Sequence, residues 1–147
     1  PANWWSTVQI DLGSQHGIKV NMPVVTPNGL VGRVSAVGTY RSQVVLVGDP
    51  NCKVAAVVQN STGDAGVIGN ASPLDRGMVE LGYLPPTAAL KPGQDVMTSG
   101  LGGTFPRGIP IGKVVDARPV EYGIAMEARV KLATSLGALN EVWVLML

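Results

Sequence analysis

The sequence predicts an all-β chain arranged as two small barrels, and three observations lead to this expectation. Apolar and polar residues alternate along short segments, which is typical of half-buried strands. Turn-forming combinations of Gly, Pro, Asn and Asp separate these segments, and no stretch of about ten positions keeps a helical apolar spacing without an interrupting Gly or Pro. Several segments recur in the same order in both halves, which predicts two units of similar topology.

The clearest strands are VQIDL at 8–12 and MEARVKL at 126–132. In the second segment the apolar residues share one face, and Glu127, Arg129 and Lys131 share the other. A register slip by one residue would bury three charges, so the register of this strand is well specified. Shorter strands are expected, in chain order, at 23–26, 30–37, 43–47, 53–58, 65–68, 78–81, 95–98, 111–117 and 141–146.

The internal repeat rests on three pairs of segments in the same order. They are GIKVNMPVVT (17–26) with ALKPGQDVMT (89–98), GLVGRV (29–34) with IPIGKV (109–114), and QVVLVGDPNCKV (43–54) with ARVKLATSLGALNEV (128–142). We therefore expect a first barrel at 13–70 and a second at 71–147. The N-terminal strand at 3–12 is a candidate to complete the second barrel. Each unit is too small to be very stable unless it packs on the other.

Composition excludes several classes of function. Hydrophobic residues make up 46% of the 147 residues and charged residues 14%, which excludes a disordered tail. The net charge of +1, without a basic stripe, argues against nucleic-acid binding. Cys52 is the only cysteine, so the chain forms no internal disulfide and no thiolate metal site, and we expect it to be a small buried side chain.

Membrane attachment is expected only through a segment outside this sequence. No apolar run approaches the ~18–20 residues that cross a bilayer. The chain begins at Pro1 rather than at a methionine, which leads us to expect that an upstream signal or anchor has been removed.

The stretch TSGLGGTFPRGIPIG at 98–112 admits a nucleophile loop, a phosphate cradle or a purely architectural loop. His16, Asp49 and Ser99 occur in the order of a chymotrypsin-type triad, so a serine hydrolase is one alternative. However, Asp49 lies in the turn GDPN, and Ser99 lacks the Gly-Asp that precedes the serine of such proteases. The glycines complete neither a dinucleotide fingerprint nor a P-loop, so we expect a sharp connection between strands.

The remaining polar residues suggest neither a metal site nor a cofactor. His16 has no partner at metal-ligand spacing, and the carboxylates are scattered over turns and outward strand positions without pairing. We therefore predict no catalytic residues, no metal and no cofactor.

The same stretch carries a family resemblance. TSGLGGTFPRGIPIGKV, preceded by KPGQDVM, resembles the signature region of the bacterial rod shape-determining MreC family. The opening NWWSTVQIDLGSQHGIKVNMPVVTPNGLVGRVSAVG, the segment SQVVLVGDPNCKVAAVV and the closing NEVWVLML are also similar to this family, so the resemblance covers nearly the whole chain. The positions that match its motif, which we expect to be structural, are Thr98, Ser99, Gly100, Gly102, Gly103, Phe105, Pro106, Gly108 and Gly112.

The resemblance implies a fold and a function. The fold would be a pair of six-stranded-type β-barrels, similar in topology to chymotrypsin-like barrels but without protease activity. The function would be a non-enzymatic scaffold of the cell-elongation machinery in the periplasm, tethered to the inner membrane by an upstream anchor. Its implied partners are the class B penicillin-binding transpeptidase of elongation, the MreD and MreB system, and further copies of itself in dimers or filaments.

Bulky residues near turns of the second half are the candidates for partner contact, namely Tyr83, Leu84, Phe105 and Tyr122. A peptidoglycan-binding module is a further alternative. It would need an aromatic platform, against which the aromatic content of 5% counts.

Overall fold

The computed structural model describes residues 7–71 and 77–146, and nearly all of its regular elements are strands. The strands are β1 (Thr7–Ile10), β2 (Pro23–Thr26), β3 (Gly29–Val37), β4 (Ser42–Leu46), β5 (Val54–Val58), β6 (Ala65–Ala71), β7 (Met78–Leu84), β8 (Asp95–Thr98), β9 (Pro110–Val120), β10 (Ala125–Leu132) and β11 (Trp143–Val144). Within the described ranges the helical elements are single 3-10 turns: η2 (Ser14–His16), η3 (Glu121–Gly123) and η4 (Leu136–Ala138). The predicted all-β class is confirmed, and each expected strand overlaps an observed one.

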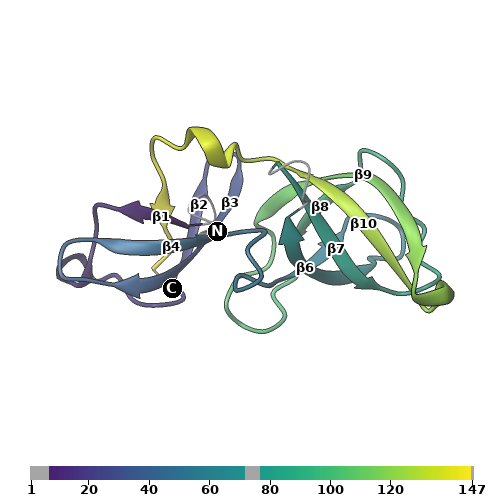
Figure 1. Cartoon of the computed structure of the whole chain (residues 1–147), viewed down its shortest axis with the longest axis horizontal. Coiled ribbons are helices and arrows are strands. Elements are labelled where there is room, and N and C mark those ends of the chain that lie inside the picture. The colour runs from purple at the N-terminus through teal and green to yellow at the C-terminus, as the bar shows by residue number, and fades with distance from the viewer. Residues whose placement is uncertain (1–6, 72–76, 147) are drawn as a thin grey trace.

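The strands form two units that lie side by side (Figure 1). One is a five-stranded sheet in the order β1-β4-β3-β2-β11, and the other is a closed barrel in the order β10-β7-β6-β5-β8-β9. All neighbouring strands are antiparallel. The second unit is thus a six-stranded barrel as expected. The first differs from the expectation, because it has five strands within the described residues, with β1 and β11 at its edges.

The internal repeat is confirmed by the strand pairing. Strands β2, β3 and β4 correspond to β8, β9 and β10, and both sets have their irregularities at equivalent steps. The β2–β3 register shifts between Val24 and Val25, and the β8–β9 register shifts between Val96 and Met97. A bulge adds local twist and bends the strand that carries it. The two halves therefore share their curvature as well as their strand order.

Equivalent backbone hydrogen bonds lie beside these bulges. The Val34 N–H donates to Met22 O at 2.9 Å, and in the barrel the Val114 N–H donates to Gln94 O at 2.9 Å. The carbonyls of the two valines also accept equivalent bonds: the Asn21 N–H donates to Val34 O and the Gly93 N–H to Val114 O, both at 2.8 Å. The repeat is thus reproduced at the level of single bonds.

The expected division at residue 70 does not follow the sheets. Strands β5 and β6 precede that residue but belong to the barrel, whereas β11 at the end of the chain pairs with β2 of the first sheet. The expected place of the N-terminal strand also differs, because β1 pairs with β4. In both repeats the chain crosses to the other unit after the last of the three equivalent strands, β4 and β10. The barrel thus receives β5 and β6 from the first half, and the first sheet receives β11 from the second. Local periodicity identifies strands but does not report this exchange.

Two hydrophobic clusters form the core, and they meet at the junction of the units. One belongs to the five-stranded sheet and contains Ile10, Ile18, Val24, Val31, Val34, Val44 and Leu46. The other fills the barrel but also includes Val25, Leu30 and Val45 of the first sheet. Leu136, in the segment that crosses from β10 to β11, packs against both clusters. The hydrophobic burial that stabilises one unit is therefore shared with the other.

The predicted register of β10 is confirmed. Ala128, Val130 and Leu132 are buried, while Arg129 and Lys131 face solvent. The barrel interior thus takes the apolar face, and the charged face of β10 remains available on the outside.

Candidate partner-binding surface

The glycine-rich motif is a structured connection between β8 and β9. The Thr98 hydroxyl donates to Pro106 O at 2.6 Å and accepts from the Ile109 N–H at 2.9 Å, so one buried side chain joins both ends of the loop. Gly100, Gly102, Gly103 and Gly108 all have positive φ, between 77° and 96°. Residues with a Cβ rarely adopt this backbone conformation, which explains the residue type at these four positions.

Two further motif positions are also fixed by local contacts. The Ser99 N–H donates to Ala55 O at 2.9 Å, which ties the loop to β5. At Gly112, an added Cβ would lie 2.0 Å from Lys131 O, because β9 and β10 approach closely there. These contacts support an architectural role for the motif.

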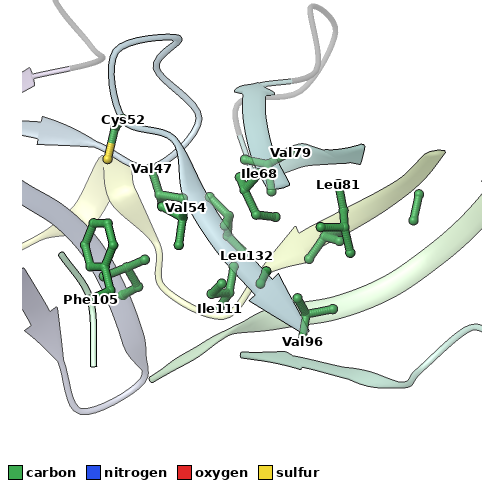
Figure 2. Close-up of a cluster of buried hydrophobic side chains, with 14 of the residues drawn as sticks. Val47, Cys52, Val54, Ile68, Val79, Leu81, Val96, Phe105, Ile111 and Leu132 are labelled. Atoms are coloured by element: carbon green, nitrogen blue, oxygen red, sulfur yellow. The ribbon is translucent and has the colours of Figure 1, made fainter. Parts of the chain in front are cut away.

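Phe105 lies in the core at the junction and not on the surface. Its side chain is 5% exposed, and Figure 2 shows the ring on the same side of the cluster as Cys52. Its cluster contains residues of both units. The expectation that Phe105 contacts a partner is therefore not supported, because its apolar surface is already used inside the protein.

Leu84 is a second candidate that the structure places in the core. It ends β7 at 1% exposure, whereas the preceding Tyr83 is 80% exposed. Val79 and Leu81 face the barrel interior, so simple alternation would also have placed Tyr83 inside. The register between β7 and β10 shifts between Leu81 and Leu84, where Tyr83 has a positive φ, and this irregularity turns Tyr83 to solvent and Leu84 into the barrel. Only Tyr83 of this pair is available to a partner.

The available candidates gather at the end of the barrel that is remote from the five-stranded sheet (Figure 1). Tyr122, in the η3 turn between β9 and β10, is fully exposed, and Ile124 beside it is 69% exposed. β7 ends at the same place, because Leu84 pairs with Met126. We call Tyr83, Tyr122 and Ile124 the distal aromatic surface. Ile124 was not among the residues expected from sequence, and its position after a turn gave no signal of exposure.

The backbone beneath this surface is strained. Tyr83, Glu121 and Tyr122 have φ values of 60°, 52° and 57°. Non-glycine residues in the left-handed region cost free energy and concentrate at functional sites. Here the strain holds two tyrosines away from the barrel wall, where a partner can reach them.

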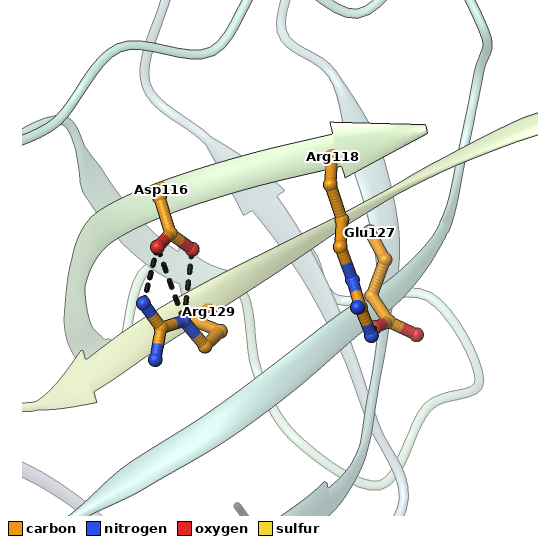
Figure 3. A network of polar contacts seen from close by, with 4 residues as sticks. All are labelled: Asp116, Arg118, Glu127 and Arg129. Atoms are coloured by element: carbon orange, nitrogen blue, oxygen red, sulfur yellow. Dashed lines mark hydrogen bonds and ion pairs between the residues drawn. The ribbon is translucent and has the colours of Figure 1, made fainter. Parts of the chain in front are cut away.

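Charged residues pair across β9 and β10, the two strands that the η3 turn joins (Figure 3). Arg129 Nε donates to Asp116 Oδ1 at 2.9 Å, and Arg118 Nη2 lies 3.0 Å from Glu127 Oε1. Hydrogen bonding from Arg129 lowers the pKa of the Asp116 carboxyl. The sequence contained a signal for this face, since opposite charges alternate in DAR at 116–118 and EAR at 127–129 on consecutive strands.

The expectation that no carboxylates pair is wrong at one position. Glu80 of β7 lies close to Glu127, and its burial together with that like charge raises the pKa of Glu80. The two residues come from segments far apart in the sequence, so spacing alone could not reveal the contact.

The three residues of the hydrolase alternative are engaged separately. His16 Nδ1 accepts from the Gly13 N–H at 3.0 Å, Asp49 Oδ1 accepts from the Asn51 N–H at 2.7 Å, and Ser99 Oγ accepts from the Leu101 N–H at 3.3 Å. No hydrogen bond joins any two of these three side chains in the structure. Each instead supports its own turn.

Neither a metal cluster nor a spanning helix is found in the described part of the chain. Within 7–71 and 77–146, no group of three His, Cys, Asp or Glu side chains is placed to hold a metal ion. No helix in these same ranges is long and apolar enough to cross a membrane. Burial raises the pKa of the Cys52 thiol to about 11, which fits the expected inert side chain.

Comparison with known proteins identifies relatives over the whole chain. A family model described as rod shape-determining protein MreC, barrel core, matches residues 1–146. The cell shape-determining protein MreC of Listeria monocytogenes is 40% identical over 147 residues, covering 99% of this chain and 50% of that protein. The chain thus spans about half the length of this relative.

Solved structures agree with this match. The structure of MreC from Listeria monocytogenes aligns with a TM-score of 0.91 at 38% identity, covering 98% of this chain and 69% of that one. A complex between penicillin-binding protein PBP2 and MreC from Helicobacter pylori aligns with a TM-score of 0.73 at 20% identity, covering 95% of this chain and 86% of that one. At that identity the second likeness shows the fold alone.

Proposed function

The chain belongs to the rod shape-determining MreC family, and from this premise we propose that it is a non-enzymatic scaffold of the cell-elongation machinery. It acts in the periplasm, attached to the inner membrane through a part of the whole protein that this chain does not include. By binding the class B penicillin-binding transpeptidase of elongation, it organises lateral peptidoglycan synthesis. The family match supports this role, as does the complex that MreC of Helicobacter pylori, which shares this fold, forms with the penicillin-binding protein PBP2.

The observation that carries the proposal is the distal aromatic surface. Tyr83 and Tyr122 are exposed on strained backbone beside Ile124, next to charged residues on β9 and β10. Tyrosine is enriched in the energetically dominant positions of protein interfaces, and a charged rim favours correct orientation of a partner. We assign this end of the barrel to the transpeptidase.

A binding titration tests the assignment. The domain is titrated with the periplasmic part of the transpeptidase, and the dissociation constant is compared with those of Tyr83→Ala and Tyr122→Ala. Each variant is expected to weaken binding by about 5- to 30-fold, since truncating a central aromatic residue costs about 1–2 kcal/mol. Neither side chain is buried, so both variants should keep the thermal unfolding midpoint of the parent.

Leu101→Ala is the matched control, because Leu101 is 69% exposed but lies on the loop after β8. It should leave the dissociation constant unchanged. Equal effects of all three substitutions would place the contact elsewhere, and undiminished binding by a Tyr83, Tyr122 double variant would exclude the distal aromatic surface.

We further propose that the scaffold self-associates and cooperates with the MreD and MreB system. Support for self-association comes from β1 and β11, which each lie at an edge of the five-stranded sheet. Edge strands present unpaired backbone donors and acceptors that a strand of a second copy can use. Sedimentation across concentration tests this, and a single monomeric species at all concentrations would argue against it.

A further inference from the structure

The barrel has one strand more than the five-stranded sheet, and the repeat identifies its position. β1 lies beside β4 as β7 lies beside β10, and β11 lies beside β2 as β5 lies beside β8. In the barrel, β6 pairs with both β5 and β7 and so closes the sheet. Within the described residues no strand lies in the equivalent place, between β1 and β11. We call this place the open strand position.

The two strands that border the open strand position are edges of one curved sheet. Four strand-to-strand steps lead from β1 to β11, which would span about 19 Å in a flat sheet. Val8 of β1 and Val144 of β11 nevertheless pack against the same hydrophobic cluster. Since every pairing is antiparallel, β1 and β11 run in the same direction. A strand between them would therefore be antiparallel to both, as β6 is to β5 and β7.

Apolar side chains beside the open strand position are less buried than those of the equivalent barrel strands. Val54 of β5 and both Val79 and Leu81 of β7 have no exposed surface. Val8 and Val144 are only partly buried, although they face the same kind of cluster. A further strand would cover their remaining apolar surface, which is favourable in water.

On the β11 side, the free backbone groups belong to Val144. The Leu145 N–H donates to Pro23 O at 2.8 Å, so Leu145 directs its backbone toward β2. Successive residues of an antiparallel strand direct their N–H and C=O to alternate sides. Val144 therefore directs its N–H and C=O away from β2 and toward the open strand position.

On the β1 side, the same alternation identifies Gln9. The Val47 N–H donates to Val31 O at 2.9 Å, so Val47 faces β3 and, three residues earlier, Val44 faces β1. Val44 stands opposite Val8, which therefore pairs with β4. Gln9 follows Val8 and directs its N–H and C=O away from β4. β1 has no second partner strand within the described residues.

Pairing on both sides restricts the kind of segment that fits. Every described strand of this chain already has at least one partner strand. A strand of a folded second copy can therefore add to β1 or to β11, as in the self-association proposed above, but it cannot pair with both. The occupant must be an extended segment without a partner strand of its own, and its inward side chains must be apolar.

Unpaired acidic residues lie at the two ends of the open strand position. Asp11 directly follows β1, and Glu141 comes two residues before β11. Because β1 and β11 run in the same direction, the two carboxylates lie at opposite ends. Both residues are exposed, and neither forms an ion pair within the described residues. A segment with a basic residue at each end would complement them.

We propose that the open strand position binds an extended segment of a partner protein, with alternating apolar and polar residues and a basic residue at each end. The segment adds as a strand antiparallel to β1 and β11 and completes a six-stranded barrel like the second unit. Backbone hydrogen bonds to both edges and apolar contact with Val8 and Val144 supply the affinity. Asp11 and Glu141 fix its position along the strands.

The test is a titration of the ¹⁵N-labelled 147-residue domain with the peptide KVTITVK, blocked at both ends. Amide shifts are expected at 7–11 and 141–146. Two N-methylated forms, one modified at both threonines and one at both valines, separate the two edges, because backbone donors alternate between sides. Both forms should bind at least about tenfold more weakly, since each loses its hydrogen bonds to one edge.

The basic ends are tested with the peptide EVTITVE, which should bind at least about fivefold more weakly than KVTITVK. The double variant Asp11→Asn, Glu141→Gln should remove this difference. Glu121→Gln is the matched control, because Glu121 is an exposed carboxylate in the η3 turn of the barrel, and it should leave the difference unchanged. All three substituted side chains are exposed, so the amide spectrum of each variant reports whether it is folded.

Several outcomes would overturn the proposal. An absence of shifts at about 5 mM peptide would exclude the site, and equal affinity for the two peptides would exclude a basic partner. Weaker binding of only one N-methylated form would mean addition to a single edge. Shifts at the same amides on concentrating the domain alone would assign the position to a second copy. Loss of peptide binding in the whole protein would assign it to another segment of that protein. The transpeptidase contact affects none of these results.

Discussion

Phe105 is the only phenylalanine of the chain, and its position explains why a large aromatic residue interrupts a glycine-rich loop. The loop folds back so that the ring enters the shared cluster at 5% exposure. Phe105→Ala should lower the free energy of unfolding by about 3–5 kcal/mol, because it removes buried surface and leaves a cavity. Chemical denaturation measures this loss.

Leu101→Ala serves as the control in the same loop. Leu101 is exposed, so its truncation is expected to change the free energy of unfolding by no more than about 0.5 kcal/mol. A Phe105→Ala loss as small as that of Leu101→Ala would show that the ring does not pack at the junction in solution.

Glu80 should make stability depend on pH. Its folded-state pKa is raised above the ordinary value of 4.5, so the folded protein holds this proton more tightly than the unfolded chain does. The free energy of unfolding therefore falls as pH rises from about 4.5 through the folded-state pKa. Glu80→Gln removes this contribution, and the variant should gain stability relative to the parent across that window.

Denaturation curves of both proteins between pH 4 and 8 test this prediction. The pKa of Asp116 is shifted in the opposite direction, and its effect appears at lower pH. Its lowered pKa stabilises the folded protein above the ordinary carboxyl pKa of 3.8, and this contribution is lost only as the pH falls below that value. Parallel stability profiles of parent and Glu80→Gln would show that the Glu80–Glu127 contact does not form.

At the scale of the strand, the sequence predicted the position of a strand and the face of its residues wherever apolar and polar residues alternate. β10 follows its alternation from Ala128 to Leu132, and β2 and β8 lie at the expected positions 23–26 and 95–98. The ends of the long β9 were not predictable, since it continues through Arg118 and Pro119 by pairing with β10 and not by burial. Pairing across strands is a tertiary property that no single segment encodes.

Gly32 and Gly112 are equivalent in the repeat and should be equally intolerant of a side chain. A Cβ at Gly32 would lie 1.9 Å from Val45 O, and one at Gly112 would lie 2.0 Å from Lys131 O. Because backbone atoms block both positions, Gly32→Ala and Gly112→Ala should each destabilise by roughly 1–3 kcal/mol. Thermal unfolding of the purified variants measures the effect.

Gly82→Ala is the matched control, since Gly82 lies in β7 with no atom within 4 Å of an added Cβ and without a positive φ. It should be neutral. If Gly112→Ala is as well tolerated as Gly82→Ala, the close approach of β9 and β10 is not a feature of the protein in solution.

At the scale of the whole molecule, the exchange of strands is the feature that sequence could not reveal. The third repeat match, 43–54 with 128–142, contains both segments that cross between the units, so it was correct as a correspondence. It led to a wrong boundary because a repeat in sequence does not state which unit its last strand joins. Leu84 and Phe105 were misjudged for a related reason, since a bulky residue near a turn can point into either a core or solvent.

The exchange predicts that the two units unfold together. β5 joins the barrel from the first half and β11 joins the first sheet from the second, and one hydrophobic cluster includes residues of both units. The amides of Val34 and Val114 make equivalent hydrogen bonds in the two units, so they form a matched pair for native-state hydrogen exchange. Both should exchange with the same free energy of opening, and Phe105→Ala should lower the two values equally. Opening of Val34 at a lower free energy, unaffected by Phe105→Ala, would mean that the five-stranded sheet unfolds on its own and that the shared core does not couple the units.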